Sequence, residues 1–537
     1  MSARTHQPLY ILTEGAQRTQ GRSAQESNIR AGKVVANAVR TTLGPRGMDK
    51  MLVDASGTVV VTNDGATILG EMDIEHPAAK MIVEVAESQE ESVGDGTTTA
   101  AVLAGELLVR AESLLDGDVH PTVVVEGYDE AVGIALATLD ELTLAESEGA
   151  AAPRSDGDAV GLDDDLLARV AESSMTGKGT GDVEADVLAE RVVAAVRRAT
   201  DDDGHVDRER IHVVPRTGAS SGATRLVEGV VVDTDPVADA MPHSVEDATV
   251  AVVDVKLDVR KGSVDTEYSI TNADQFDAAL AAEETELRGY ATALADADVD
   301  VVFCTEAIDD RVASHLAREG ILAFANVNGS DARAIARAVD ARRLGSLTDF
   351  DADDLGHADA VDIERYGTDD LVVVEGGAAA AAATLLVRGS TDHVVDELER
   401  AVTDAVDAAV AAVESGGVVP GAGATEIALA DAVRAAAAGV EGRKQLAVEA
   451  FAEALDALPR TLAENAGMDP IDALVDLRAR HEAGERVGII AGGQHGAVDD
   501  PVEHGIVDPA AVKREALESA AEAATMILRI DDVIAAR

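Results

Sequence analysis

Residues 94–99, Gly-Asp-Gly-Thr-Thr-Thr, combine the residue types that a phosphate-binding loop needs. The apolar pattern predicts that this loop joins a helix over 78–92 to a helix over 100–115. Glycines let the backbone approach a ligand closely, and the amides at a helix N-terminus point toward anions. Asp95 would repel a phosphate directly, which favours a Mg²⁺ ion that Asp95 holds against the phosphate. A cluster of helix-capping residues has the same composition, so this segment alone leaves both interpretations open.

Two further carboxylates, Asp64 and Asp404, are candidates for catalysis. Asp64 lies in an Asn-Asp-Gly turn that follows a β-hairpin predicted over residues 51–53 and 58–61. Asp404 lies on the polar face of a helix predicted over 391–413. Phosphoryl transfer to water needs a group that orients the attacking water beside the metal. In a chain with 101 acidic residues, a solvated surface acid is the alternative interpretation of each.

The sequence contains no Walker A loop. The stretch 177–180, Gly-Lys-Gly-Thr, has Glu172 where that motif requires its first glycine. Further backbone contacts to a ligand are available from Gly44-Pro45, at the end of a helix predicted over 28–43, and from Gly-Ala-Gly at 421–423. HExxH and GxSxG motifs are also absent, so zinc-protease and serine-hydrolase chemistry have no candidate residues.

The composition narrows the class of protein. The chain has 537 residues and a formal net charge of −57, with 46 % apolar but only 2 % aromatic residues. We therefore expect folded cores built from Ala, Val and Leu. Nucleic-acid binding is excluded, because it needs clustered cations and aromatic platforms. So acidic a surface is tolerated when salt screens it, which predicts a halophilic host and unfolding in dilute buffer.

The distribution of residues along the chain predicts its organisation. Residues 145–165 are small, polar and acidic, as expected of an exposed connection. Residues 211–375 alternate apolar β-runs with helical stretches, whereas both ends are mainly helical, so we expect the ends to meet around an inserted middle. The single cysteine, Cys304, excludes an internal disulfide. No apolar run approaches the roughly 20 residues that span a bilayer, and we expect a cytoplasmic protein with no membrane partner.

Eight segments, in order along nearly the whole chain, resemble the group II chaperonins, the thermosome family. The most specific are VVVTNDGATIL at 59–69 and VGDGTTTAAVLAGELL at 93–108. The others lie at 39–54, 72–86, 173–179, 301–310, 385–401 and 526–534.

This resemblance implies a multi-domain chaperonin fold of mixed α+β and α/β class. It comprises a mostly helical equatorial domain, a small intermediate hinge domain, and an α/β apical domain with a helical lid protrusion. The implied bounds are 1–161 and 415–537 for the equatorial domain, 162–223 and 376–414 for the intermediate domain, and 224–375 for the apical domain, with the lid at about 257–295.

The resemblance also implies an ATP site with Mg²⁺, and together with a salt-rich host it makes K⁺ a further candidate cofactor. Asp64 and Asp404 would be the catalytic residues that position the hydrolytic water, and Asp95 would hold the metal. The implied nucleotide-binding residues are Thr42, Leu43, Gly44, Pro45, Asp95, Gly96, Thr97, Thr98, Thr99, Lys178, Gly421, Gly423 and Asp508.

The implied function is that of an ATP-dependent molecular chaperone whose ATPase is coupled to protein folding. Its partners would be non-native client proteins and other chaperonin subunits, in a double ring of sixteen that encloses the client under a built-in lid. Two departures from the family pattern leave alternatives open: Ala422 replaces the middle residue of a triple glycine, and a glycine- and methionine-rich tail is missing. The alternatives are a ring scaffold with weak or no ATPase, and a metabolic phosphotransferase.

Overall fold

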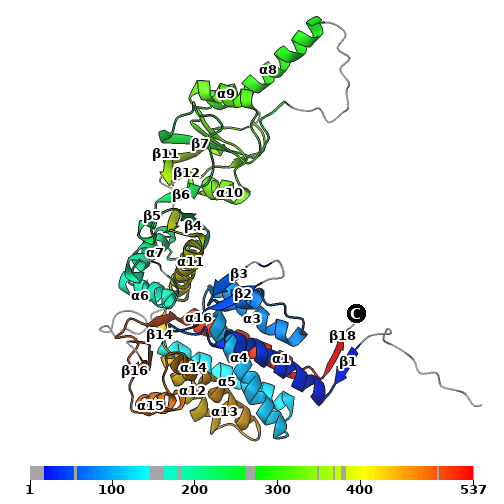
Figure 1. Cartoon of the computed structure of the whole chain (residues 1–537), viewed down its shortest axis with the longest axis vertical. Helices are drawn as coiled ribbons and strands as arrows, with labels where there is room; N and C mark the ends of the chain where they lie inside the picture. The colour runs from blue at the N-terminus through cyan, green and yellow to red at the C-terminus, as the bar shows by residue number, and fades with distance from the viewer. Residues whose placement is uncertain are drawn as a thin grey trace, which may run out of the picture. The chain divides into compact units, whose positions relative to one another are not determined.

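The chain forms two compact units. The computed structural model describes residues 17–53, 57, 59–144, 162–179, 181, 183–201, 203–259, 273–347, 350–366, 369–376, 382–492 and 495–535. The first unit combines the two ends of the chain, residues 1–178 and 404–537, and the second is the continuous middle, residues 179–403 (Figure 1). The finer division into three domains stays a prediction.

The first unit is mainly helical. It contains two-stranded antiparallel pairs at its edges: β1 (Gln17–Gln20) with β18 (Asp532–Ala535), β2 (Lys50–Val53) with β3 (Val59–Thr62), β14 (Val418–Pro420) with β17 (Val507–Pro509), and β15 (Gly488–Ile490) with β16 (Ala497–Asp499). Its helices are α1 (Arg22–Arg40), α2 (Gly65–Gly70), α3 (Pro77–Val93), α4 (Thr97–Asp116), α5 (Pro121–Leu142), α6 (Asp164–Met175), α12 (Ala424–Ala437), α13 (Lys444–Leu455), α14 (Ala457–Asn465), α15 (Pro470–Glu482) and α16 (Ala510–Leu528).

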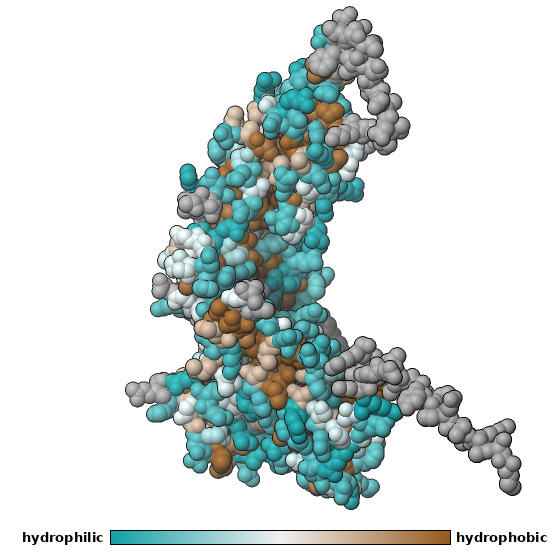
Figure 2. Space-filling model, turned by 45° about the vertical axis from the view of Figure 1, so that its right-hand side comes forward, coloured by the Kyte–Doolittle hydropathy of each residue, from teal (hydrophilic) through white to brown (hydrophobic). Residues whose placement is uncertain are grey.

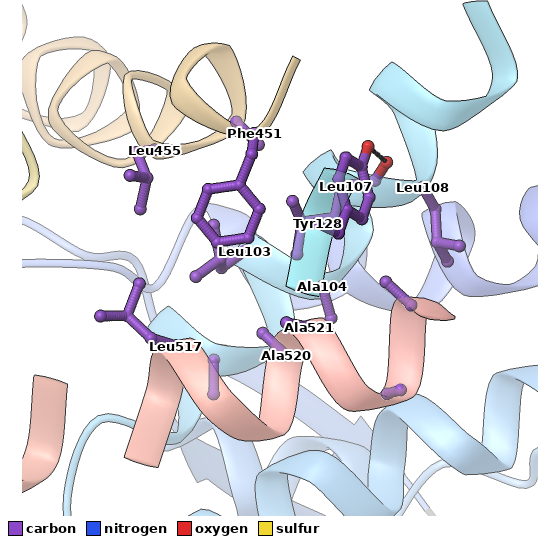
Figure 3. Packing of buried hydrophobic residues seen from close by; sticks show 14 of the residues in the cluster. Leu103, Ala104, Leu107, Leu108, Tyr128, Phe451, Leu455, Leu517, Ala520 and Ala521 are labelled. Atoms are coloured by element: carbon purple, nitrogen blue, oxygen red, sulfur yellow. Dashed lines mark hydrogen bonds between the residues drawn. The ribbon is translucent and has the colours of Figure 1, made fainter. Parts of the chain in front are cut away.

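Helix α4 forms the centre of this unit. It contacts α1, α3, α13 and α16, and most of its residues from Ala100 to Leu108 are buried. Alanine and leucine make up most of this core, as the composition predicts (Figure 3). The rings of Tyr128 and Phe451 meet edge to face at 5.7 Å, a contact worth about 1 kcal/mol beyond area burial. The Tyr128 hydroxyl donates to the Leu107 carbonyl at 2.8 Å, which satisfies the one polar atom of that buried ring.

The second unit is built on a seven-stranded mixed sheet with the order β6-β12-β11-β7-β8-β9, and β10 pairs with β7. Strands β7, β8 and β9 are parallel, and all four residues of β8 are buried, as in sheets covered on both faces. A smaller sheet has the order β4-β13-β5. The strands are β4 (Ile211–Thr217), β5 (Arg225–Val227), β6 (Gly229–Val232), β7 (Ser244–Val253), β8 (Val301–Cys304), β9 (Leu322–Phe324), β10 (Arg343–Leu344), β11 (Gly356–Tyr366), β12 (Asp369–Gly376) and β13 (Ala383–Gly389).

The helices of the second unit are α7 (Ala185–Ala199), α8 (Ala273–Asp296), α9 (Asp310–Glu319) and α10 (Gly329–Ala338), with short 3-10 turns at Arg208–Arg210, Ser221–Ala223 and Ala352–Asp354. Helix α11 (Asp392–Ser415) belongs to both units, since the division falls at residue 404. The prediction of mixed helix and sheet for the middle of the chain is therefore confirmed.

Two predicted segments are only partly described. Of the predicted lid at 257–295, residues 260–272 lie outside the described residues, and the rest includes α8. Leu287 and Leu294 of α8 are buried against the sheet, whereas Leu280 is exposed. The predicted connection at 145–165 also lies mostly outside the described residues.

The visible surface is largely hydrophilic (Figure 2). Figure 2 shows hydrophilic residues over much of the visible face of both units, with apolar patches between them. Among the described helices, none combines the length and the apolar character needed to cross a bilayer.

Candidate active site

A cavity of about 230 Å³ lies in the first unit. It brings together loops that are hundreds of residues apart in sequence. Its wall consists of residues 42–45, 63–65, 90, 94–99, 173, 174, 176, 178, 404, 422, 423, 426, 458, 462, 489, 506, 508, 512 and 513.

The loop between α3 and α4 has a backbone that requires glycine at two positions. Gly94 (φ 65°) ends α3 and Gly96 (φ 83°) precedes α4, and both lie in the left-handed region that other residues rarely enter. A Cβ at Gly94 would also collide with the side chain of Asp407. The buried Gln89 amide donates to the Asp95 carbonyl at 2.8 Å, which fixes the loop from beneath. The N-terminus of α4, with its unpaired amides, therefore faces the cavity.

Asp64 and Asp95 meet at this end of the cavity. Asp64 caps α2: one carboxylate oxygen accepts the Thr67 amide at 2.6 Å, and the other accepts the Thr97 hydroxyl at 3.4 Å. Asp95 accepts the Gly96 amide at 2.7 Å. Burial raises the pKa of Asp95 above its usual range, and Lys178 partly opposes that rise.

The donor set fits a magnesium ion that arrives with a phosphate. Carboxylate and hydroxyl oxygens from Asp64, Asp95 and Thr97 are the hard ligands that Mg²⁺ prefers. Within the described part of the chain, no three His, Cys, Asp or Glu side chains are arranged to hold a metal by themselves. The remaining ligands of such an ion would have to be water and phosphate oxygens, which is common for Mg²⁺.

Lys178 and Asp404 form a half-buried ion pair at the same end of the cavity, and the lysine ammonium donates to Asp404 Oδ2. The pKa of Asp404 is raised to about 6. Burial raises it most, the charge of Lys178 opposes the rise, and the charge of Asp95 adds to it. Burial alone would lower the pKa of Lys178, but Asp404 and Asp95 raise it overall, so the lysine is charged. Asp404 is thus protonated at a higher pH than an ordinary aspartate.

A second part of the wall, which we call the apolar end, contains Asp508 and Ile506, and both lie beside Gly421: a Cβ there would come within 2.9 Å of Ile506 Cγ2 and 3.3 Å of the Asp508 carboxylate oxygens. The other apolar residues of the wall are Leu458, Leu462, Ile489 and Val512. A charged cluster consists of Lys513 with two carboxylates: the ammonium lies 2.7 Å from Glu426 Oε1 and 2.8 Å from Asp508 Oδ2. The cavity therefore has a strongly polar end and a less polar end, which suits a ligand with a polyanionic part and a flatter, uncharged part.

A model of the TCP-1/cpn60 chaperonin family matches residues 35–537. The chain belongs to this family. It is 68 % identical to thermosome subunit 3 of Haloferax volcanii over the full length of both chains. It is 49 % identical to thermosome subunit alpha of Halobacterium salinarum, over 99 % of this chain and 92 % of the relative, and 49 % identical to the thermosome subunit of Methanopyrus kandleri, over 98 % and 94 %.

Family membership gives the activity. The chain is a chaperonin subunit: an ATP-dependent chaperone with ATPase activity, from a family whose thermosome members form double rings that bind unfolded proteins. The chaperonin is thereby favoured over the metabolic phosphotransferase. Relatives from the halophilic archaea Haloferax volcanii and Halobacterium salinarum support the halophilic host expected from the net charge.

The structure gathers nearly all of the residues singled out in the sequence on one cavity wall. These are Thr42, Leu43, Gly44, Pro45, Asp64, Asp95, Gly96, Thr97, Thr98, Thr99, Lys178, Asp404, Gly423 and Asp508. Gly421 lies behind the wall instead: a Cβ at this position would lie 3.3 Å from both carboxylate oxygens of Asp508. Its neighbour Ala422 lines the cavity with a φ of 57°, a left-handed conformation that costs a non-glycine residue about 1 kcal/mol.

Three charged residues of the wall escaped the sequence analysis. Lys513 and Glu426 form a pair between α16 and α12, and no motif marks either residue. Glu90, on the last turn of α3, faces the cavity rim, where burial and then the charges of Asp404 and Asp64 raise its pKa to about 8. The rarity of lysine was a signal that the sequence offered for this pair. Because the chain has only eight lysines, Lys513, five residues after Asp508, was a candidate ion-pair partner of that residue.

Proposed function

We propose that the cavity binds MgATP with the triphosphate at the polar end and the nucleoside at the apolar end, and that Asp64 and Asp404 position the water that attacks the γ-phosphate. The observation that carries this proposal is the convergence of Asp64, Asp95 and Asp404, from three distant segments, on one cavity. The amides of 97–99 and the loop 42–45 hold the phosphates, as at other helix N-termini.

Asp95 is the residue that holds the metal, together with phosphate oxygens and water. When bound, Mg²⁺ neutralises charge that develops on the phosphates in the transition state. The ionised Asp404 carboxylate accepts a hydrogen bond from the attacking water, and Asp64 orients that water from the other side. Thr67 and Thr97 hold Asp64 in place through the bonds described above, so its carboxylate needs little reorganisation.

The Lys178 ammonium can donate hydrogen bonds either to Asp404 or to the γ-phosphate of a bound nucleotide. In the structure it is paired with Asp404. A γ-phosphate at this end of the cavity offers the ammonium a more highly charged partner, and the exchange releases Asp404 to act on water. We therefore expect Lys178 to report the presence of the γ-phosphate to Asp404.

The charge of the cavity explains why cations are required. Two lysines, Lys178 and Lys513, face six carboxylates on the wall: Asp64, Glu90, Asp95, Asp404, Glu426 and Asp508. A triphosphate brings further negative charge, so binding without cations would be opposed by electrostatic repulsion. Mg²⁺ relieves part of this repulsion, and K⁺, abundant in a salt-rich host, is the proposed second cation.

Lys178 and Asp404 also stand at the two connections between the units. Lys178 is the last residue of the first unit before the chain enters residues 179–403, and Asp404 is the first residue after it returns. A displacement of the second unit therefore acts first on this ion pair. We propose that this couples hydrolysis to movement of the intermediate domain, 162–223 and 376–414, and of the apical domain with α8 in its lid, in a double ring of sixteen subunits.

The proposal is tested by measuring phosphate release and refolding of a chemically denatured client by the purified particle in KCl-rich buffer. Asp404→Ala is expected to lower the rate of phosphate release about a hundredfold or more and to abolish ATP-dependent refolding. Asp396→Ala is the matched control, since it removes an exposed carboxylate from the same helix outside the cavity wall. Equal rates for wild type and Asp404→Ala would overturn the assignment of Asp404 and favour a ring scaffold with weak or no ATPase.

A further inference from the structure

Lys513 is a buried lysine that neither the hydrolytic scheme nor the chaperone activity uses. It lies on the first turn of α16 with 13 % of its side chain exposed, and it is bonded to Glu426, with 6 % exposed, and to Asp508, with 28 % exposed. Burial lowers the pKa of such an ammonium, but the carboxylates of Asp508 and Glu426 reverse the effect and raise it. The lysine is therefore charged at neutral pH.

The two carboxylates of the cluster differ in their surroundings. This difference indicates that Lys513 acts mainly on Asp508. One ammonium is shared by two carboxylates. Glu426 lies in the first turn of α12, where the helix dipole favours a negative charge, although its Oε2 atom is buried without a hydrogen-bond partner among the described residues. A buried carboxylate oxygen without a hydrogen bond lowers the stability of the fold. We therefore expect the cluster to contribute to binding instead.

Asp508 is held from two sides. Its Oδ2 atom accepts from Lys513, and its backbone lies in β17, where it pairs with Val419 of β14. Gly421 lies against the carboxylate, and a Cβ there would come within 3.3 Å of both oxygens. The apolar side chain of Ile506 lies on the same side of Gly421 as this carboxylate, since a Cβ at Gly421 would lie 2.9 Å from Ile506 Cγ2. The carboxylate is thus confined to one orientation on the wall, with Oδ1 left to accept from a ligand.

We propose that Lys513 is a positioning residue, which fixes the Asp508 carboxylate to accept a hydrogen bond from a ribose hydroxyl of the nucleotide, while Glu426 fixes Lys513. The inference rests on the proposed function, which puts the nucleoside at the apolar end of the cavity, where Asp508 lies. Ribose hydroxyls are neutral donors, and an oriented carboxylate acceptor with apolar neighbours is the chemistry that recognises them. Without the lysine, Asp508 would rotate toward water and repel the phosphates of the same ligand.

The test is a comparison of nucleotides on the assembled particle. For Lys513→Gln, the KM for ATP is expected to rise about tenfold, as for the loss of one hydrogen bond to a charged group, while kcat changes less than about twofold. The preference for ATP over 2′-deoxy-ATP and 3′-deoxy-ATP should fall by a similar factor, since a ribose contact is what is lost. Lys33→Gln is the control, because Lys33 pairs with Glu112 outside the cavity wall.

A double-mutant comparison separates positioning from mere stability. If Lys513 acts through Asp508, the variant carrying both Lys513→Gln and Asp508→Asn should have the KM and the nucleotide preference of Asp508→Asn alone. Effects that multiply, or a fall in kcat at unchanged KM, would overturn the inference. If Lys513→Gln fails to assemble, Lys513→Arg keeps the charge with a different reach, and it should still raise KM and weaken the preference for ATP.

The same variants test the role of Lys513 separately from the proposed nucleotide site. No change in nucleotide preference for Asp508→Asn would mean that Asp508 does not read the ribose, and the nucleoside assignment would fail. A changed preference for Asp508→Asn, with none for Lys513→Gln and Lys513→Arg, would leave that assignment standing and refute the positioning role of Lys513.

Discussion

The two ends of the cavity have the same ingredients in different settings. Each has one buried lysine paired with carboxylates: Lys178 with Asp404 at the polar end, and Lys513 with Asp508 and Glu426 at the apolar end. Lys178 and Asp404 are 226 residues apart and stand where the chain leaves and re-enters the first unit. The Lys513 cluster comes from α12, β17 and α16, all within the C-terminal part of that unit.

This difference suggests that the polar end couples hydrolysis to movement of the second unit, whereas the apolar end binds the nucleotide. We expect an ion pair at the two chain connections to respond to movement of the second unit, which would suit the polar end to a step that must be timed. A cluster fixed within one helical framework is indifferent to such motion and is suited to recognition. Substitution of Lys178 or Asp404 should therefore change kcat, and substitution of Lys513 or Asp508 should change KM.

The largest effect is expected at the metal-holding residue of the polar end. Asp95→Ala removes the carboxylate that we propose holds Mg²⁺, and kcat/KM for ATP should fall about a thousandfold. Steady-state phosphate release across a Mg²⁺ titration checks this. A rate that recovers fully at high Mg²⁺ would show that Asp95 contributes only affinity for the metal; an unchanged rate at low Mg²⁺ would contradict its role.

Lys178→Gln should lower kcat about tenfold to a hundredfold and leave the KM for ATP within about threefold, the opposite of the pattern expected for Lys513→Gln. The two substitutions delete the same group from the two ends, so each is the matched control of the other. Measuring kcat and KM for both under identical salt decides the comparison. If both variants changed kcat and KM in the same way, the proposed difference between the two ends would be wrong.

The pH dependence of hydrolysis is expected to follow Asp404. Its pKa of about 6 lies above that of an ordinary aspartate, so the active ionised form is lost as the pH falls through 6 rather than near 4. Below pH 6, kcat/KM should fall about tenfold per pH unit. Because Lys178 lowers the pKa of Asp404, Lys178→Gln should move this decline to higher pH, whereas Lys513→Gln should leave it in place. A decline that stays below pH 5 would exclude Asp404 as the titrating group.

The smallest effect is expected at Ala422 of the cavity wall. Its left-handed backbone (φ 57°) is relieved by glycine, although glycine also gains entropy in the unfolded chain. Ala422→Gly should therefore stabilise the protein by less than about 1 kcal/mol, with kcat and KM nearly unchanged. Thermal unfolding in high salt checks this, and a loss of stability would mean that the methyl group has packing contacts worth more than the backbone strain.

The sequence predicted the local parts of the site well. A loop joins the two helices as the composition indicated, although it ends at Gly96 and residues 97–99 form the first turn of α4, and the hairpin before Asp64 forms between β2 and β3. Spacing alone did not bring Asp64, Asp95 and Asp404 together; that expectation came from the family resemblance, because their contact depends on tertiary folding. The pairing of Lys513 with Glu426 was missed for the same reason: it arises where α16 meets α12, and neither residue has a local signature.

The central claim is that Asp64, Asp95 and Asp404 act on one nucleotide. Single-turnover hydrolysis of labelled ATP by Asp404→Asn, with the Kd for MgATP measured in parallel, tests it most directly. The account predicts a Kd within about threefold of wild type and a hydrolysis rate at least about a hundredfold slower, because binding relies on Asp95 and the phosphate loops while the water relies on Asp404. Hydrolysis at the wild-type rate, with ATP bound normally, would contradict it.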